Sequence, residues 1–234
     1  VYNIPKDRLY ATVFEGDVKE GIPASSIALA KWKSLLRDEH IVFGNKKDNF
    51  WEMGETGPCG PCSEIHVDCR PDEERKKIPG HTLVNKDHPQ VIEIWNNVFI
   101  QYNRKKDGSL EPLSATHVDT GMGLERLATI MQGVTSIFET DAIRQILAKA
   151  EELLGVTYGD AKSSDTSLRI ITDHVKSAAM LISDGVLPSN EGRGYILRRL
   201  IRRSVMHGQK LGIEKLFLNE LVPVVADVME SYYP

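Results

Sequence analysis

The stretch of sequence at residues 118–126 reads Val118-Asp119-Thr120-Gly121-Met122-Gly123-Leu124-Glu125-Arg126. This order predicts the end of a strand, a glycine turn and a helix that begins near Met122. Gly121 and Gly123 lack a Cβ atom, so a ligand can lie against the backbone. Arg126 offers a permanent planar cation that suits a polyphosphate, and Asp119 can hold an ammonium group. The same pattern is also common as plain structure, so it needs support from the rest of the chain.

Two stretches upstream provide that support. They read Asp48-Asn49-Phe50-Trp51-Glu52-Met53-Gly54-Glu55-Thr56-Gly57-Pro58-Cys59-Gly60-Pro61-Cys62-Ser63-Glu64 and Glu93-Ile94-Trp95-Asn96-Asn97-Val98-Phe99. Residues 54–60 are rich in glycine and proline, and residues 70–90 are charged and carry three prolines, so both are predicted loops. Residues 91–102 form a β-rich run that predicts a strand.

The flanking regions differ in their periodicity. Residues 8–16 alternate as a strand does, residues 27–36 carry apolar positions at helical spacing, and a second strand is expected before residue 45. After Gly133 the apolar residues recur at helical spacing over three ranges, 142–154, 166–183 and 195–211. Asp165 or Thr166 is the predicted N-cap of the second helix, Asp184-Gly185 its end, and Gly212 the end of the third. The sequence therefore predicts an α+β fold with a boundary between residues 136 and 165.

Composition excludes several classes of protein. The 234 residues carry a net charge of −4, and 41% of them are hydrophobic, which is enough apolar surface for a core. No run approaches the roughly 18 to 20 apolar residues that cross a bilayer, and no signal stretch opens the chain. A cytoplasmic protein without a membrane partner is expected. The chain begins at Val1 without a methionine, so we expect an excised piece of a longer protein.

At the three quoted stretches the sequence resembles the alanyl-tRNA synthetase family of class II aminoacyl-tRNA synthetases. The resemblance extends over essentially the whole chain, and residues 121–126 look like the third signature motif of the class. It implies that residues 1–140 are the later part of the class II catalytic domain, an antiparallel sheet with flanking helices that lacks motifs 1 and 2. Residues 141–234 would then be the beginning of an all-α helical domain that recognises tRNA.

The resemblance also implies roles for single residues. The ATP site would contain Arg126 on the phosphates, Gly121, Gly123 and, on magnesium or ATP, Glu93. The alanine site would contain Asp119 on the ammonium group, Asn96, and the apolar walls Trp51 and Val98. The alternative is structural, with core packing for the two apolar residues and strand capping for the two polar ones.

The implied activity is that of a ligase that activates alanine with ATP and Mg²⁺ and attaches it to alanine tRNA. Because motifs 1 and 2 are missing, we expect no catalysis by this chain alone. A non-enzymatic RNA-binding module derived from a synthetase is the alternative.

The three cysteines lie close together in the sequence. Cys59, Cys62, His66 and Cys69 offer four ligands within eleven residues, compatible in type with a tetrahedral Cys3His zinc site. The alternative is a rigid loop at the edge of the active site in which the thiols are incidental.

A basic segment lies near the C-terminus. Residues 193–210 contain no acidic residue and carry Arg193, Arg198, Arg199, Arg202, Arg203 and Lys210. Like charges at i, i+4 destabilise a helix slightly, so an anionic partner is expected to offset them. The alternative is a solvated face paired with Asp173 or Asp184. The preceding loop, residues 184–193, resembles the family's segment that reads the acceptor stem of alanine tRNA, and Asn190 is the residue implied to contact a base edge.

Overall fold

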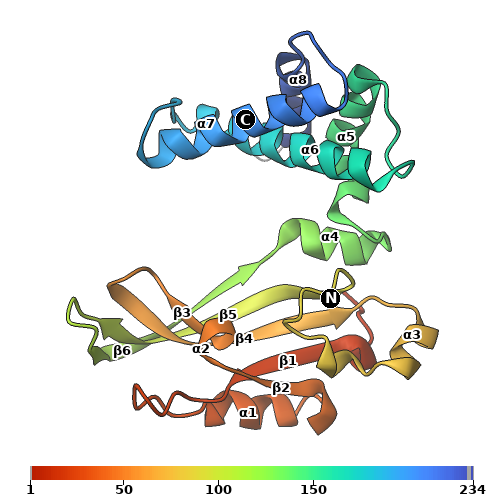
Figure 1. The fold of residues 1–234 in the computed structure, drawn as a ribbon. Helices are drawn as coiled ribbons and strands as arrows, with labels where there is room; N and C mark the ends of the chain where they lie inside the picture. Colours follow the sequence, from red (N-terminus) through yellow and green to blue (C-terminus); the bar gives the residue numbers. More distant parts are fainter. Residues whose placement is uncertain (1, 231–232, 234) are drawn as a thin grey trace. The chain divides into compact units, whose positions relative to one another are not determined.

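The computed structural model describes residues 2–230 and 233 (Figure 1). The chain divides into two compact units, Val1–Ser136 and Ile137–Pro234, which we call the sheet unit and the helical unit. Each unit is described by itself.

The sheet unit is built on one six-stranded sheet. Its strands are β1 (Leu9–Phe14), β2 (Ile41–Gly44), β3 (Phe50–Glu52), β4 (Gly57–Asp68), β5 (Val91–Arg104) and β6 (Leu110–Met122). The strand order is β2-β1-β4-β5-β6, and β3 also pairs with β4. The predicted antiparallel sheet is in fact mixed, because β1 and β2 are parallel. A parallel pair needs a crossover connection, which here contains helix α1 (Ser26–Lys33).

The first strand, helix and second strand expected before residue 45 are confirmed, although α1 ends earlier than predicted. The predicted strand at residues 91–102 is confirmed as β5. Short helical segments fill the connections, and they are η1 (Lys6–Arg8), η2 (Asp38–His40) and α2 (Lys46–Asn49).

Two predicted loops are wrong in part. Residues from Gly57 onward belong to β4. At Gly60 the backbones of β4 and β5 come into close contact, since a Cβ atom there would lie 1.9 Å from the carbonyl oxygen of Phe99. Glycine in a strand often marks such a close approach. Residues 70–90 contain helix α3 (Asp72–Lys77) and the turn η3 (Gly80–Thr82). The α3 helix begins with three acidic residues and ends with three basic ones, an order that complements its dipole.

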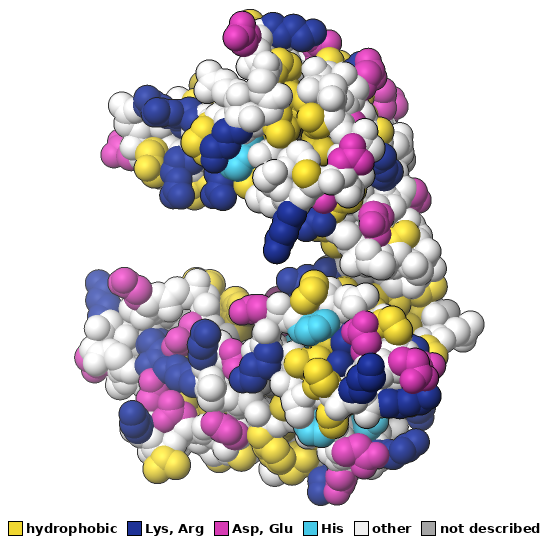
Figure 2. Space-filling view, turned by 45° about the vertical axis from the view of Figure 1, so that its right-hand side comes forward, with side chains coloured by type: hydrophobic (Ala, Val, Ile, Leu, Met, Phe, Trp, Pro, Cys, Tyr) yellow, Lys and Arg dark blue, Asp and Glu magenta, His cyan; other side chains and the backbone are white. Residues whose placement is uncertain are grey.

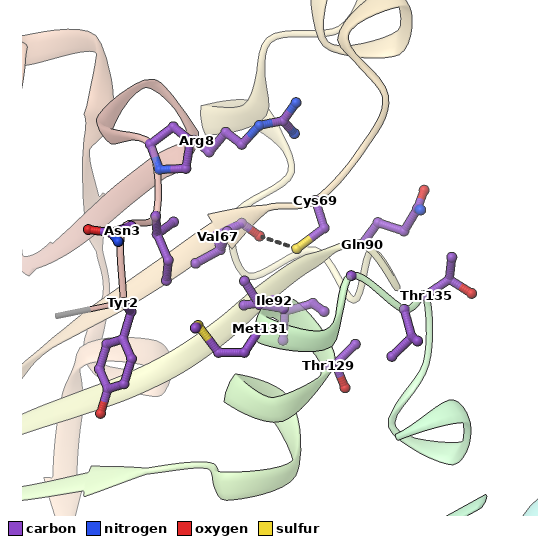
Figure 3. Close-up of a pocket in the computed structure, with 15 residues that line it drawn as sticks. Tyr2, Asn3, Arg8, Val67, Cys69, Gln90, Ile92, Thr129, Met131 and Thr135 are labelled. Atoms are coloured by element: carbon purple, nitrogen blue, oxygen red, sulfur yellow. Dashed lines mark hydrogen bonds between the residues drawn. The ribbon is translucent and has the colours of Figure 1, made fainter. Parts of the chain in front are cut away.

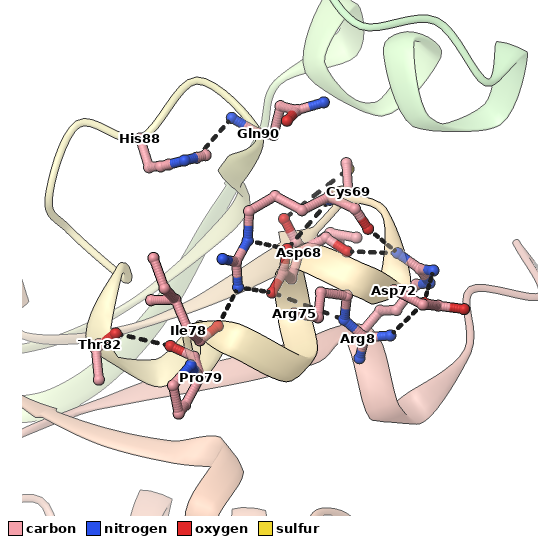
Figure 4. Close-up of polar contacts among 12 residues, drawn as sticks. Arg8, Asp68, Cys69, Asp72, Arg75, Ile78, Pro79, Thr82, His88 and Gln90 are labelled. Atoms are coloured by element: carbon pink, nitrogen blue, oxygen red, sulfur yellow. Dashed lines mark hydrogen bonds and ion pairs between the residues drawn. The ribbon is translucent and has the colours of Figure 1, made fainter.

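A buried ion pair fixes the segment that follows β4 (Figure 4). Arg70 donates from Nε and Nη2 to the two carboxylate oxygens of Asp68 at 2.9 and 2.7 Å, and both residues are almost fully buried. Arg70 also donates to the carbonyl oxygen of Ile78, and Arg8 donates to the carbonyl oxygens of Asp68 and Arg70. The cluster therefore connects the N-terminal segment, the end of β4 and the residues that follow α3.

The helical unit packs its helices around an apolar core. It contains η4 (Ile137–Glu139), α5 (Asp141–Leu154), α6 (Lys162–Ser183), α7 (Gly192–Lys210) and α8 (Leu218–Met229). The core side chains come from α5, α6 and α8 and include Ile146, Leu147, Leu168, Ile171 and Leu221, all fully buried. The three predicted helices are confirmed as α5, α6 and α7.

The ends of α6 and α7 test the predicted caps. The N-cap of α6 is Ala161, without a side-chain hydrogen bond, so Asp165 and Thr166 are not its cap. Asp165 lies inside the first turn and accepts a hydrogen bond from the backbone N–H of Gly159 at 2.7 Å. The other two predictions are confirmed, since Gly185 and Gly212 follow α6 and α7 with φ of +82° and +92°, the left-handed conformation that ends many helices.

Candidate functional site

The register of β4, β5 and β6 brings most of the predicted alanine-site residues together. Asp119 on β6 lies opposite Val98 on β5, and Gly121 lies opposite Asn96. Partners in neighbouring strands share a face of the sheet, and so do residues two positions apart on one strand. These four residues therefore form a contiguous patch on one face of the sheet.

The open side of this patch lies over Gly121. Gly121 is not in a turn, as predicted, but inside β6, and no atom lies within 4 Å of the position that its Cβ would occupy. The turn comes at Gly123, which is the N-cap of α4 (Leu124–Gln132) and donates its N–H to the carbonyl oxygen of Ile94 at 3.1 Å. The sheet edge formed by β6 is exposed along residues 114–121. A ligand has room to lie on this part of the sheet.

Arg126 is placed by two features of its surroundings. Its aliphatic stem folds back over Gly123, where a Cβ atom would lie 3.1 Å from Arg126 Cδ. Its Nη1 donates to the carbonyl oxygen of Glu93 at 2.9 Å and to Glu93 Oε2 at 3.1 Å. Half of the Arg126 side chain is exposed, so the guanidinium can still meet an anion from solvent. The structure thus joins the two charged residues predicted for ATP.

Asn96 carries a buried oxygen without a partner. Its Oδ1 atom accepts no hydrogen bond from any described residue. Burial raises the pKa of the Cys62 thiol to about 12, and a hydrogen bond with the side chain of Asn96 acts in the opposite direction. A buried acceptor left without a donor costs free energy, so this atom marks a place where a ligand donor would be stabilised.

The remaining two alanine-site residues differ in their placement. Asp119 is exposed, and its Oδ1 accepts the backbone N–H of Thr120 at 2.8 Å. Trp51 lies on β3 and pairs with Gly60 of β4, so two strands separate it from β6. At about 4.8 Å per strand spacing it lies roughly 14 Å from β6. The sheet therefore does not place Trp51 directly beside Asp119.

A buried polar network borders the patch, and no sequence pattern predicted it as a unit. Glu64 lies opposite Asn96 in β4. Its Oε2 accepts from Thr12 Oγ1 at 3.2 Å, His66 Nε2 at 3.0 Å and Asn85 Nδ2 at 2.9 Å. Burial alone would raise the pKa of Glu64, but these hydrogen bonds outweigh it and lower the pKa. A fixed negative charge therefore stands beside Asn96.

The predicted zinc site is not formed. Cys59 packs in an apolar cluster, Cys62 approaches the carbonyl oxygen of Asp48, His66 bonds Glu64, and Cys69 approaches the carbonyl oxygen of Val67. The reason is the extended backbone of β4, which at about 3.3 Å per residue separates Cys59 from Cys69 by roughly 30 Å. Among the described residues no group of three His, Cys, Asp or Glu side chains could hold a metal ion.

A separate cavity of about 340 Å³ lies where β4 ends and β5 begins (Figure 3). The N-terminal residues, the strand ends and the C-terminal part of α4 line it, with Val67, Ile92 and Met131 among the apolar walls and Cys69 among the polar ones. None of the predicted alanine or ATP residues lines it, so this cavity is not the predicted site.

In the helical unit, basic side chains gather along α7 (Figure 2). A groove of about 740 Å³ is lined by Asn190, His174, Tyr195, Ile196, Leu200 and four of the six basic residues, Arg198, Arg199, Arg202 and Arg203. Arg193 belongs to the same helix and is exposed. Within the described part of the chain no ion pair joins these arginines to Asp173 or Asp184, and Asp173 instead pairs with His174 at 2.8 Å.

No helix in the described residues is both long enough and apolar enough to cross a membrane.

Comparisons with known proteins relate the chain to one family. A family model described as class II tRNA synthetases (A) matches residues 1–234. The chain is 53% identical to the alanine–tRNA ligase of Bacteroides thetaiotaomicron, 52% identical to that of Parabacteroides distasonis and 48% identical to that of Flavobacterium psychrophilum, with all of the chain covered. It spans 27%, 27% and 28% of the length of these three relatives.

Proposed function

Because this chain belongs to the class II tRNA synthetases, we propose that it is part of an enzyme that activates alanine with ATP and attaches it to the 3′ end of alanine tRNA. The sheet unit would hold part of the alanine and ATP site, and the helical unit would contact the acceptor stem. The three cysteines are free thiols, which supports action in a reducing cytoplasm.

The observation that carries this proposal is the unpartnered Oδ1 atom of Asn96. It lies in the same patch as the exposed carboxylate of Asp119, beside the open space over Gly121. The ammonium group of an amino acid offers three donors and a positive charge, so it satisfies both an orphaned acceptor and a carboxylate. Asn96 and Asp119 together select a free α-amino group and do not distinguish one amino-acid side chain from another.

Side-chain selection must then depend on the size of the pocket, with Val98 as one wall and Trp51 as a more distant one. A single methylene changes binding by only about 1–3 kcal/mol. Serine and glycine would therefore be excluded poorly, and editing by a separate site is expected.

ATP would lie toward Arg126 and Glu93. The exposed half of the Arg126 guanidinium suits a phosphate, since a planar fork of donors matches phosphate oxygens. The Glu93 carboxylate is a hard oxygen ligand of the kind that Mg²⁺ prefers. A magnesium ion held by Glu93 would neutralise phosphate charge. When Arg126 reaches the phosphates, it would exchange its bond to Glu93 for one to the nucleotide.

The helical unit would bind the acceptor stem through the groove along α7. Arginines suit the phosphates, and an amide such as that of Asn190 can meet a base edge in the shallow minor groove of A-form RNA. The same groove would also serve a non-enzymatic RNA-binding module, which is the second candidate.

A chimera tests the proposed enzyme. The matching segment of the Bacteroides thetaiotaomicron ligase is replaced by this chain, and alanine-dependent exchange of pyrophosphate into ATP is measured. We expect the chimera to be active and the isolated chain to be inactive. An inactive but folded chimera would favour the non-enzymatic module, and substantial exchange by the isolated chain would refute the expectation that it is inactive alone.

Two leucine substitutions in the chimera test the alanine site itself. Asn96→Leu removes an oxygen that has no partner and an amide that contacts the Cys62 thiol, so the fold should lose little stability while alanine-dependent exchange falls at least a hundredfold. Asn103→Leu is the matched control on the same strand, opposite Pro58, and should leave exchange unchanged. Equal activity of both variants would remove Asn96 from the alanine site.

A further inference from the structure

The loop before α7 holds Asn190 in a defined position. Ser189 Oγ donates to the carbonyl oxygen of Glu191 at 2.8 Å. Gly194 packs against the loop so closely that a Cβ atom there would lie 2.3 Å from the carbonyl oxygen of Leu187 and 2.4 Å from Ser189 Oγ. The backbone that carries Asn190 is therefore fixed by contacts within the helical unit.

The side chain of Asn190 is fixed by a different contact. Its Oδ1 accepts a hydrogen bond from Nη1 of Arg198, which lies two turns into α7. A planar amide carries its oxygen and nitrogen on opposite arms. When Oδ1 faces Arg198, the Nδ2 amino group with its two donors points the other way, and it has no partner among the described residues.

The other arginines of α7 are arranged differently. The guanidinium of Arg199 lies over the ring of Tyr195, 5.7 Å from its centroid. Arg193, Arg202 and Arg203 are exposed and pair with no described residue. These three can approach phosphates without giving up a contact, whereas Arg198 is already bound to the residue expected to read a base.

We propose that Arg198 is a positioning residue, which orients the Asn190 amide so that it presents a donor to the RNA groove. The inference rests on the proposed RNA contact and deepens it. Asn190 would then recognise an acceptor at a base edge, purine N3 or pyrimidine O2, and not the amino group of guanine. The bond is weak in water because both side chains are exposed, but it strengthens when bound RNA excludes solvent.

The first arm of the test needs no RNA. Nitrogen-15 relaxation of the Asn190 side-chain amide is measured in this chain and in Arg198→Met, Arg198→Lys and Arg202→Met. Arg198→Met should lower the order parameter of the amide, Arg198→Lys should restore part of it, and Arg202→Met should leave it unchanged. Equal order in the wild type and Arg198→Met would overturn the proposal.

The second arm measures binding to acceptor-stem hairpins. Each purine is changed in turn to its 3-deaza analogue and each pyrimidine to its 2-thio analogue, and these changes remove or weaken one groove acceptor. In a second set, each guanosine is changed to inosine, which removes the amino group. At one position, loss of the acceptor should weaken binding about fivefold, the effect of one neutral hydrogen bond. In Arg198→Met and in Asn190→Ala this penalty should fall below twofold, and the double variant should lose nothing more.

Arg202→Met is the control for charge. It should weaken binding to every hairpin alike and lower the slope of log affinity against log salt by about one unit, while the acceptor penalty stays. The inference would be overturned if only the inosine substitutions weakened binding, or if loss of the acceptor still weakened binding to Arg198→Met about fivefold. If the chain binds no hairpin, the proposed RNA contact fails, and the relaxation experiment alone decides whether Arg198 orients Asn190.

Discussion

The two units differ in the kinds of side chain that they bury. The sheet unit buries polar and charged side chains, among them Thr12, Asn49, Glu64, His66, Asp68 and Arg70. The largest cluster of the helical unit is apolar, and its arginines lie on the outside of α7. The difference concerns how the two proposed sites are supported: the one in the sheet unit lies beside a buried polar network and depends on strand register, and the one in the helical unit consists of surface groups on an apolar scaffold.

The largest expected effect follows from breaking the buried ion pair. Arg70→Met removes the two guanidinium hydrogen bonds to the buried Asp68 carboxylate and leaves Arg75, at 3.8 Å, as the cation beside it. Loss of one partner of a buried ion pair typically costs about 3–5 kcal/mol. Urea unfolding followed by probes in both units should show an earlier transition of the sheet unit. Lys76→Met, at an exposed pair with Glu73, is the control and should change the midpoint little.

An apolar truncation in the helical unit should be next in size. Leu147 is fully buried in the α5–α6–α8 core, and removal of its side chain in Leu147→Ala should cost about 3 kcal/mol through lost burial and the cavity left behind. Only the transition of the helical unit should move. A loss that is shared equally by both units would show that they unfold together and would break the comparison.

The third prediction concerns the charge of Glu64. Because the folded-state pKa of Glu64 is lowered below its ordinary value of 4.5, its contribution is present above about that pH and is lost as pH falls through the folded-state pKa. Glu64→Gln should cost about 1–2 kcal/mol at pH 7, since neutral hydrogen bonds replace charged ones. It should also flatten the loss of stability below pH 4.5, as measured by urea unfolding at a series of pH values. An unchanged acid profile would contradict an ionised Glu64.

The smallest expected effect concerns His207, a residue of α7 that contacts Ser167 of α6. Burial, followed by the charges of Lys210 and Arg203 on α7 and His174 on α6, lowers the pKa of His207, and Ser167 Oγ lies 3.0 Å from its Nδ1. The unfolded chain binds the proton more readily, so the helical unit should lose stability as pH falls below about 6.5, the ordinary histidine pKa. His207→Gln should remove this slope, and a slope that persists would assign it to another group.

Local patterns predicted much of the fold. The periodicity of residues 142–154 and 195–211 was sufficient for α5 and α7, and the alternation near Leu9 was sufficient for β1. The predicted loop at Gly57–Gly60 failed because glycine composition reports conformational freedom, whereas the close approach to Phe99 depends on a strand forty residues away.

The candidate site was predictable by residue more than by geometry. Motif resemblance selected Asn96, Val98 and Asp119, and the register of β5 and β6 brings them together. It did not show that Gly121 lies within a strand, or that Cys59 and Cys69 lie too far apart to share a metal. The position of Gly121 depends on the length of β6, and the separation of the two cysteines depends on the length of β4. Each strand extends beyond the residues whose alternation predicts a strand. The roles of these residues in binding remain predictions.

The exposed length of β6 has a consequence for handling the protein. In the described part of the chain this strand forms one edge of the sheet, and its outer N–H and C=O groups face no other strand. Such an edge is a template for pairing with a second molecule, and Pro112 interrupts the donors only near its beginning. Concentrated solutions of the isolated chain should therefore self-associate through added β-structure, and a lysine placed at the outward-facing Val118 should delay that process.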